Sequence, residues 1–195
     1  MYKDTNRKIL EEINSLGYLE RGKIVGRNMH CTTSVTSLGS FYSKTLEKDL
    51  HIGLKEYKSS VGGGIDFLVA LELGLVDKIE QEIPYVLEEF PLFHGICIGK
   101  EGETIGVITE DFSKSGLYSV NSINEGDKGF LPREIQRLLG KPLYDKDLAT
   151  TCFIVDGKRR IGDFGEFTLG RSEEREELSK SYFYNILEYS VKTNL

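Results

Sequence analysis

Cysteine is scarce in this 195-residue chain, which has only three: Cys31, Cys97 and Cys152. They are odd in number and far apart, which argues against a disulfide framework, and no Cys-x-x-Cys pair offers a zinc site. Reduced thiols in a cytosolic environment are therefore expected. Long apolar runs are also missing, so no segment is expected to span a bilayer, and polar residues rather than an apolar signal segment follow Met1. The pattern predicts a cytoplasmic protein, although a signal for a specialised export apparatus would not be visible in such a pattern.

Excess positive charge is lacking as well, because 25 Lys and Arg residues stand against 31 Asp and Glu residues, for a net charge of -6. No basic stripe is interleaved with aromatic residues, which argues against a nucleic-acid binder. Three familiar motifs are absent: Gly-x-x-x-x-Gly-Lys-Ser/Thr, Gly-x-Gly-x-x-Gly after a strand, and Gly-x-Ser-x-Gly. The three histidines, His30, His51 and His94, lack metal-ligand spacing. These absences argue against P-loop, dinucleotide-binding and α/β-hydrolase enzymes.

The hydrophobic pattern changes period along the chain and predicts an α+β fold, as one domain or as two small lobes that share a cleft. Apolar residues at helical spacing predict a first helix over residues 6–16. Three strands with short connections then predict an antiparallel meander, over residues 23–25, 36–42 and 51–57. A triple glycine precedes an apolar segment, 65–76, that predicts a second helix, which has ended before Pro84.

The remaining elements are shorter and more widely spaced. Residues 93–98 and 104–108 predict a strand pair, joined by a glycine-containing turn at 99–102. A polar, glycine-rich connection follows at 113–129, and then a helix at 132–139. The Asp156-Gly157 pair between two short apolar runs predicts a hairpin of strands 153–155 and 159–161. A capped helix with one apolar face is predicted over 172–191.

Three separated residues carry the chemistry expected of phosphoryl transfer. Lys55 lies near the end of a predicted strand, and Asp147 and Asp163 flank the predicted hairpin, so that their carboxylates can approach one another. Transfer from ATP needs a cation on the phosphates, a carboxylate that holds Mg²⁺ and a carboxylate that accepts the hydroxyl proton. Since Mg²⁺ prefers oxygen ligands and keeps several waters, a single aspartate on a loop is a usable ligand. One lysine and two aspartates supply this minimum set.

The order of these pieces resembles the protein kinase superfamily, over about residues 23–167. Residues 52–55 are similar to the family's strand that ends in the phosphate-binding lysine, and residues 94–96 and 107–112 are similar to the strand before the hinge and to the hinge itself. Residues 146–148 and 152–155 resemble the catalytic loop and the following strand. Asp163-Phe164-Gly165 matches the family's magnesium-binding tripeptide.

The resemblance implies a bilobal fold and a role for each matching residue. Residues 1–112 would form an N-lobe with an antiparallel sheet and an N-terminal helix, and residues 113–195 a reduced, mostly helical C-lobe. Asp147 would accept the hydroxyl proton and Asp163 would hold Mg²⁺. Lys55 would bind the phosphates of ATP, and the backbone of the hinge residues Glu110, Asp111 and Phe112 would hold adenine.

The acidic partner of Lys55 is left open among three residues of the following segment. Glu72 lies in the middle of the predicted helix among leucines, where a carboxylate would be costly to bury without a cation. The other reading is that Glu72 lies on the solvated face of that helix. Glu80 and Glu82 are the alternatives if the alignment is shifted.

Departures from the family pattern define the alternative functions. The glycine-rich loop is missing between Gly26 and Gly39, and Cys152 occupies the position of the family's second metal ligand, an asparagine. Thiols are poor ligands for Mg²⁺. Only 30 residues follow Gly165, which resembles the truncation of minimal bacterial kinase-like proteins, including small effector kinases. The resemblance implies an ATP-dependent protein kinase with a protein substrate. The alternative is a pseudokinase that acts as a protein-binding module.

Overall fold

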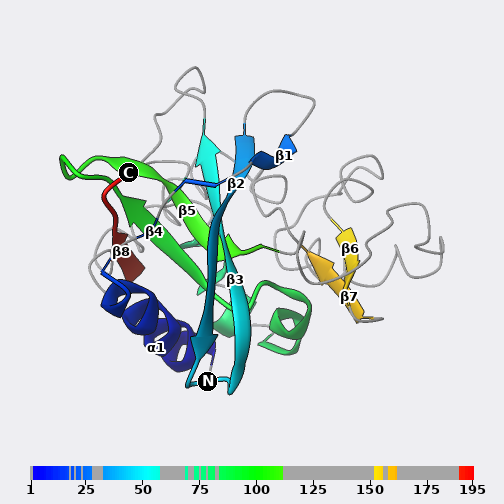
Figure 1. Cartoon of the computed structure of the whole chain (residues 1–195). Coiled ribbons are helices and arrows are strands. Elements are labelled where there is room, and N and C mark those ends of the chain that lie inside the picture. Colours follow the sequence, from blue (N-terminus) through cyan, green and yellow to red (C-terminus); the bar gives the residue numbers. More distant parts are fainter. Residues whose placement is uncertain are drawn as a thin grey trace.

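The computed structural model describes the N-terminal helix, one large sheet, one small hairpin and their nearest connections (Figure 1). The described residues are 2–17, 19, 21–22, 24–27, 33–57, 69, 73–74, 76–77, 79–81, 84–111, 152–155, 158–161 and 189–195. The predicted connection at 113–129 and the predicted helix at 132–139 lie outside these residues. Within the described residues the fold is α+β, as the sequence predicts.

A six-stranded sheet forms the centre of the described structure, with the strand order β1-β2-β3-β5-β4-β8. Every neighbouring pair is antiparallel except β4 and β8, which are parallel. The strands are β1 (Ile24–Arg27), β2 (Thr33–Ser43), β3 (Lys48–Tyr57), β4 (His94–Ile98), β5 (Thr104–Glu110) and β8 (Ser190–Lys192). The predicted meander and the predicted strand pair are both confirmed, with strand ends that differ from the prediction by a few residues.

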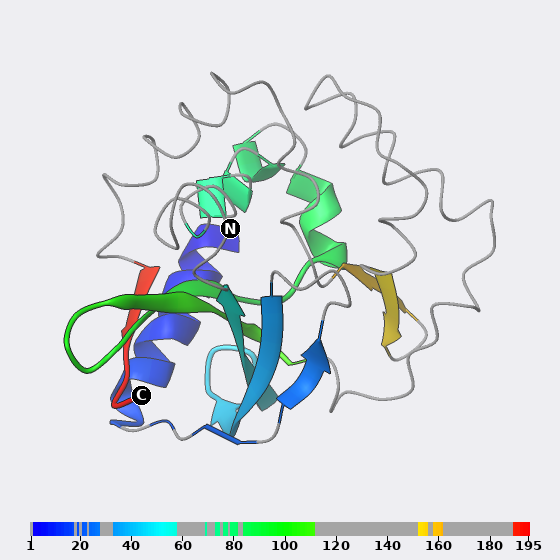
Figure 2. The same ribbon diagram turned by 90° about the horizontal axis from the view of Figure 1, so that it is seen from above.

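The first helix, α1 (Tyr2–Ser15), begins four residues earlier than the sequence predicts. Its buried face carries Ile9, Leu10 and Ile13, which belong to one apolar cluster with residues of the sheet. The helix ends at a glycine in the left-handed conformation, Gly17 (φ 70°), a common way to finish a helix. Viewed from above, α1 lies beside β8, and it also contacts β4 and β2 (Figure 2).

The segment between β3 and β4 is helical where it is described. Residues 69, 73–74, 76–77 and 79–81 have helical conformation, so the predicted second helix is present but continues past its predicted end at Val76. Val69, Leu73, Val76 and Ile79 are buried, as expected for the apolar face of a helix that packs on a sheet. A short 3-10 helix, η1 (Pro84–Glu89), follows at the predicted break.

The end of the chain differs from the prediction. Residues 172–191 were expected to be one helix in a second lobe, but Ser190–Lys192 form β8 and pair with Ile96, Cys97 and Ile98 of β4. The strand offers hydrogen bonds to the open edge of β4, and Val191 is fully buried there. The gain from edge pairing and burial outweighs the helical pattern of the preceding residues. Residues 172–188 lie outside the described residues.

The predicted hairpin is confirmed and forms a separate small sheet. Strand β6 (Cys152–Val155) pairs antiparallel with β7 (Lys158–Ile161), with Val155 opposite Lys158. Strand β7 lies close to η1 (Figure 1). Among the described residues, no helix is long and apolar enough to cross a membrane.

Candidate functional site

Lys55 lies in the interior of the sheet, in the part of β3 that pairs with β5. It is only 3% exposed. Lys55 stands opposite Val107 of β5, and Val107 stands opposite Ile96 of β4, so the three side chains share one face of the sheet. Lysine is almost never fully buried unless it is paired. The position of Lys55 therefore indicates a surrounding that supplies negative charge or an anionic ligand.

The predicted hinge residues follow directly on the strand beside Lys55. Glu110 is the last residue of β5, and Asp111 follows it; they are 9% and 2% exposed. The backbone N–H of Asp111 donates to the carbonyl oxygen of His51 at 2.9 Å, which continues the β3–β5 pairing by one residue. The Glu110 Oε2 atom accepts a hydrogen bond from the backbone N–H of Leu92 at 3.0 Å. The two strands thus bring the lysine segment and the hinge segment side by side.

His94 belongs to the same face of the sheet as Lys55, one row along. It stands opposite Thr109 of β5, which in turn stands opposite Gly53 of β3. His94 is 1% exposed. Burial, reinforced by the positive charge of Lys55, lowers the pKa of His94 from 6.5 to about 3. His94 is therefore a neutral polar group at physiological pH.

Two side chains of α1 hold His94. The Asn6 amide donates to the His94 carbonyl oxygen at 2.9 Å, and the Asn6 Oδ1 atom accepts from the His94 backbone N–H at 2.9 Å. The Tyr2 hydroxyl lies 2.9 Å from His94 Nδ1 and donates to the carbonyl oxygen of Pro91 at 2.9 Å. Burial raises the pKa of Tyr2 well above its usual value, and the nearby charges of Glu110 and Glu80 raise it further.

Glu80, one of the three candidate partners of Lys55, is half-buried on the helical segment that follows β3. Its Oε1 atom accepts a hydrogen bond from the backbone N–H of Lys3 at 2.9 Å. The Lys3 ammonium also lies 2.6 Å from the Asp77 carboxylate, one turn earlier on the same segment. Glu80 therefore already binds the start of α1 with one oxygen.

The other predicted site residues fall outside this region. Glu72, Glu82, Phe112, Asp147 and Asp163 lie outside the described residues, so their predicted roles stay predictions. Cys152 is the first residue of β6, opposite Ile161. Among described residues, no three His, Cys, Asp or Glu side chains are grouped as metal ligands would be. Three predicted residues lie on or next to the paired strands β3 and β5. Lys55 of β3 stands opposite Val107 of β5, and Glu110, the residue before Asp111, stands opposite Ile52, three residues along β3.

Sequence reasoning missed three polar residues of this region: Tyr2, Asn6 and His94. Asn6 carried a usable signal, because it lies on the apolar face of the first helix, three residues before Ile9 and four before Leu10. A polar side chain at such a position is buried and has to be hydrogen-bonded. No such signal marks Tyr2 or His94, whose partners lie about 90 residues away in sequence.

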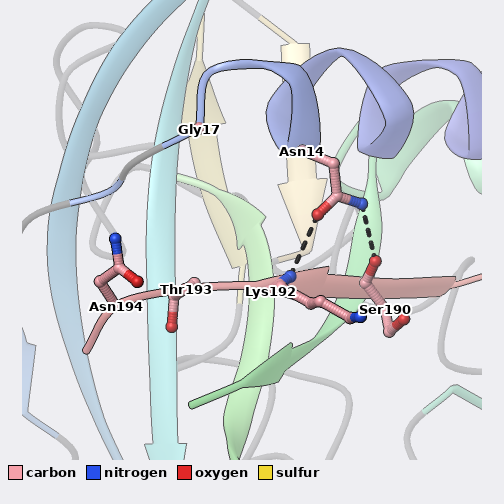
Figure 3. A pocket seen from close by; sticks show the side chains of 6 residues that line it. All are labelled: Asn14, Gly17, Ser190, Lys192, Thr193 and Asn194. Atoms are coloured by element: carbon pink, nitrogen blue, oxygen red, sulfur yellow. Dashed lines mark hydrogen bonds between the residues drawn. The ribbon is translucent and has the colours of Figure 1, made fainter. Parts of the chain in front are cut away.

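A separate surface pocket lies where α1 meets β8, at the opposite end of the helix from Tyr2. It is lined by Asn14, Gly17, Ser190, Lys192, Thr193 and Asn194 (Figure 3). The Asn14 side chain donates to the Ser190 carbonyl oxygen at 2.9 Å and accepts from the Lys192 N–H at 3.0 Å. These two bonds tie α1 to the last strand. The pocket holds none of the predicted site residues.

No model of a known protein family matches the chain, and no curated protein matches it.

Proposed function

We propose that this protein is an ATP-dependent phosphotransferase of the protein-kinase type, which transfers phosphate to Ser, Thr or Tyr of a protein substrate. The buried position of Lys55 carries the proposal. A lysine that is 3% exposed, on a strand directly beside the one that leads into Glu110 and Asp111, is the arrangement expected of a phosphate-binding lysine next to an adenine-binding hinge.

The chemistry of the residues fits the phosphate end of ATP. The Lys55 ammonium, held in an interior where charges interact more strongly than in water, would neutralise phosphate charge. The backbone beyond Asp111 would present hydrogen bonds to adenine. Asp163 would hold Mg²⁺, and Asp147 would accept the proton of the attacking hydroxyl. These two roles rest on the sequence resemblance alone.

Binding and transfer of phosphate test the proposal. The wild type should bind ATP–Mg²⁺ in titration calorimetry, and its melting temperature should rise when ligand exceeds the dissociation constant. Lys55→Met should weaken binding by about tenfold or more, the effect of losing about one charged hydrogen bond. Lys100→Met is the matched control, because Lys100 is exposed on the turn between β4 and β5. Asp163→Ala should abolish transfer of radiolabel from ATP. A folded wild type that neither binds ATP–Mg²⁺ nor transfers phosphate would refute the proposal.

A pseudokinase that binds a protein partner is the second candidate. Cys152 favours it, because a thiol at the position of the family's asparagine is a poor ligand for a second Mg²⁺. Such a protein would give a stable partner in pull-down experiments and no phosphate transfer. For either candidate, action as an effector inside a host cell belongs to the resemblance and would be tested by identifying that partner.

A further inference from the structure

The first turn of α1 contacts two separate elements that border the Lys55 face of the sheet. One is the helical segment at residues 69–81, which follows the lysine strand in sequence. The other is the start of β4, which carries His94. Residues 2–6 bond to partners between 74 and 92 positions away in sequence.

Lys3 makes the link to the helical segment. Its backbone N–H, one of the first four in α1 and so without a partner inside the helix, donates to the Glu80 carboxylate. Its ammonium pairs with Asp77 at 2.6 Å, with the Lys3 and Asp77 side chains 37% and 20% exposed. The partial exposure makes the ion pair modest in strength. The backbone bond nevertheless fixes Glu80 relative to the axis of α1.

Tyr2 and Asn6 make the link to the sheet. The Tyr2 hydroxyl bonds to the imidazole of His94 and to the carbonyl oxygen of Pro91, and Asn6 bonds to both backbone groups of His94. His94 and Lys55 lie on the same face, in neighbouring rows of side chains. Strand β5 lies between the strands that carry these two residues. The charge of Lys55 nevertheless acts on the imidazole of His94, which the Tyr2 hydroxyl contacts.

We propose that Tyr2 and Lys3 are positioning residues for Lys55. They hold the helical segment and the start of β4 at a fixed separation, across the face on which the ammonium of Lys55 meets its anionic ligand. The inference rests on the proposed function for the identity of that ligand, ATP–Mg²⁺. It assigns to α1, to which the kinase resemblance gives no catalytic or binding role, a part in setting the geometry of the nucleotide site.

The test compares Tyr2→Phe with Asn14→Ala. Tyr2→Phe removes only the hydroxyl that bonds to His94 and Pro91. Asn14→Ala removes two hydrogen bonds between the other end of α1 and β8, away from Lys55. Two quantities are measured well below the melting temperature: the affinity for ATP–Mg²⁺, and the rate at which an amine-acetylating reagent modifies Lys55, relative to exposed Lys100 in the same molecule.

Tyr2→Phe should weaken ATP–Mg²⁺ binding and speed acetylation of Lys55, each by about tenfold, the factor that one hydrogen bond of ordinary strength is worth. Asn14→Ala should leave both quantities at the wild-type value even where it lowers the melting temperature. The proposal would be overturned if Lys55 were acetylated at the same rate in Tyr2→Phe as in the wild type. It would also be overturned if the two variants had equal effects.

The acetylation rate separates this inference from the proposed function, since it needs no nucleotide. Faster acetylation in Tyr2→Phe, in a protein that never binds ATP, would retain the positioning role and refute only the kinase proposal. If Tyr2→Phe does not fold, His94→Leu removes the imidazole that the Tyr2 hydroxyl contacts and is read by the same two measurements. Unchanged acetylation in that variant would overturn the positioning role.

Discussion

The Asn6 side chain takes the place of a neighbouring strand beside His94. Its side chain forms both hydrogen bonds that a paired strand would form, one to the His94 carbonyl oxygen and one from the His94 N–H, each 2.9 Å long. Strand β8 begins its pairing with β4 only at Ile96. Asn6 thus covers the start of the β4 edge that β8 does not reach, and it does so from the buried face of a helix.

Replacing Asn6 by Ala should lower the free energy of unfolding by about 2–4 kcal/mol, because it leaves two buried backbone groups of His94 without partners. Asn14 makes the same pair of bonds to Ser190 and Lys192, but at an exposed position where water can replace it. Asn14→Ala should therefore cost about 1 kcal/mol or less. Urea denaturation at a constant m-value measures both. Equal costs would show that the burial of Asn6 is not decisive.

The low pKa of His94 should make stability depend on pH. The folded-state pKa of about 3 lies below the usual 6.5, so the unfolded chain binds more protons between these values. His94 makes its full contribution to the free energy of unfolding above about pH 6.5. As the pH falls below this value, the free energy of unfolding decreases by about 1 kcal/mol per pH unit. Denaturation between about pH 5 and 6.5, where ordinary carboxylates do not titrate, isolates this effect.

His94→Gln removes the titrating group and is the variant for that comparison. Over the same pH range its free energy of unfolding should be nearly constant, while that of the wild type falls. Among the described residues, Tyr2 of α1 and Lys55 of β3 act on His94 from other elements. Parallel curves for wild type and variant would mean that His94 has the same pKa in the folded and the unfolded protein.

Gly106 of β5 allows the close approach of the strand that carries Lys55. A Cβ atom at Gly106 would collide with the backbone carbonyl oxygen of Lys55. Gly106→Ala should therefore force β3 and β5 apart and cost about 2–4 kcal/mol of stability. Gly17→Ala is the control, since a Cβ there meets no atom within 4 Å and only the left-handed backbone conformation is strained. Its expected cost in stability is about 1 kcal/mol. Thermal unfolding compares the two, and a cost for Gly106→Ala no greater than for Gly17→Ala would contradict the close contact.

Glu12 joins α1 to the turn between β2 and β3. It accepts hydrogen bonds from the Ser43 hydroxyl at 2.7 Å and from the Thr45 N–H and hydroxyl at 2.9 and 2.8 Å. Burial alone would raise the pKa of Glu12, but these bonds outweigh it and lower the pKa. Ionised Glu12 therefore stabilises the folded protein above the pKa that Glu12 has in the unfolded chain. This stabilisation disappears as the pH falls through the pKa that Glu12 has in the folded protein.

Glu12→Gln should accordingly lower the free energy of unfolding by about 1–2 kcal/mol at neutral pH, since bonds to a charged acceptor are stronger than those to an amide. The difference from wild type should shrink in acid as Glu12 is protonated. Glu11→Gln, on the exposed side of α1, is the control. A difference that persists unchanged in acid would assign the effect to packing and not to charge.

Local patterns predicted much of the described fold. Helical spacing of Ile9, Leu10 and Ile13 identified the buried face of α1, and turn residues identified the hairpins because adjacent strands with short connections pair with each other. Strand β8 could not be found in this way. Its partner is β4, and next to this pairing Thr193 bonds to Ile98 across 95 positions in sequence. The local sequence of residues 172–192 therefore does not show that β4 has an unpaired edge with which β8 can pair.

For the candidate site, the sequence predicts the strand that carries Lys55 and the strand that leads into Glu110 and Asp111. The structure pairs these two strands, which are distant in sequence. Tyr2 and His94 meet only through the placement of α1 against β4, and that placement depends on the packing of many side chains at once. Sequence periodicity shows that α1 has a buried face, but not which strand the face covers.

The parallel pairing of β8 with β4 has a consequence for protein synthesis. The ribosome delivers β4 long before residues 190–192 exist, so the hydrogen-bonding groups of Ile96, Cys97 and Ile98 stay uncovered while the intervening residues are translated. An open strand edge is a template for pairing with other chains. Until residues 190–192 are made, the nascent protein should depend on chaperones to avoid aggregation, and cleavage after residue 189 should expose the same edge in the folded protein.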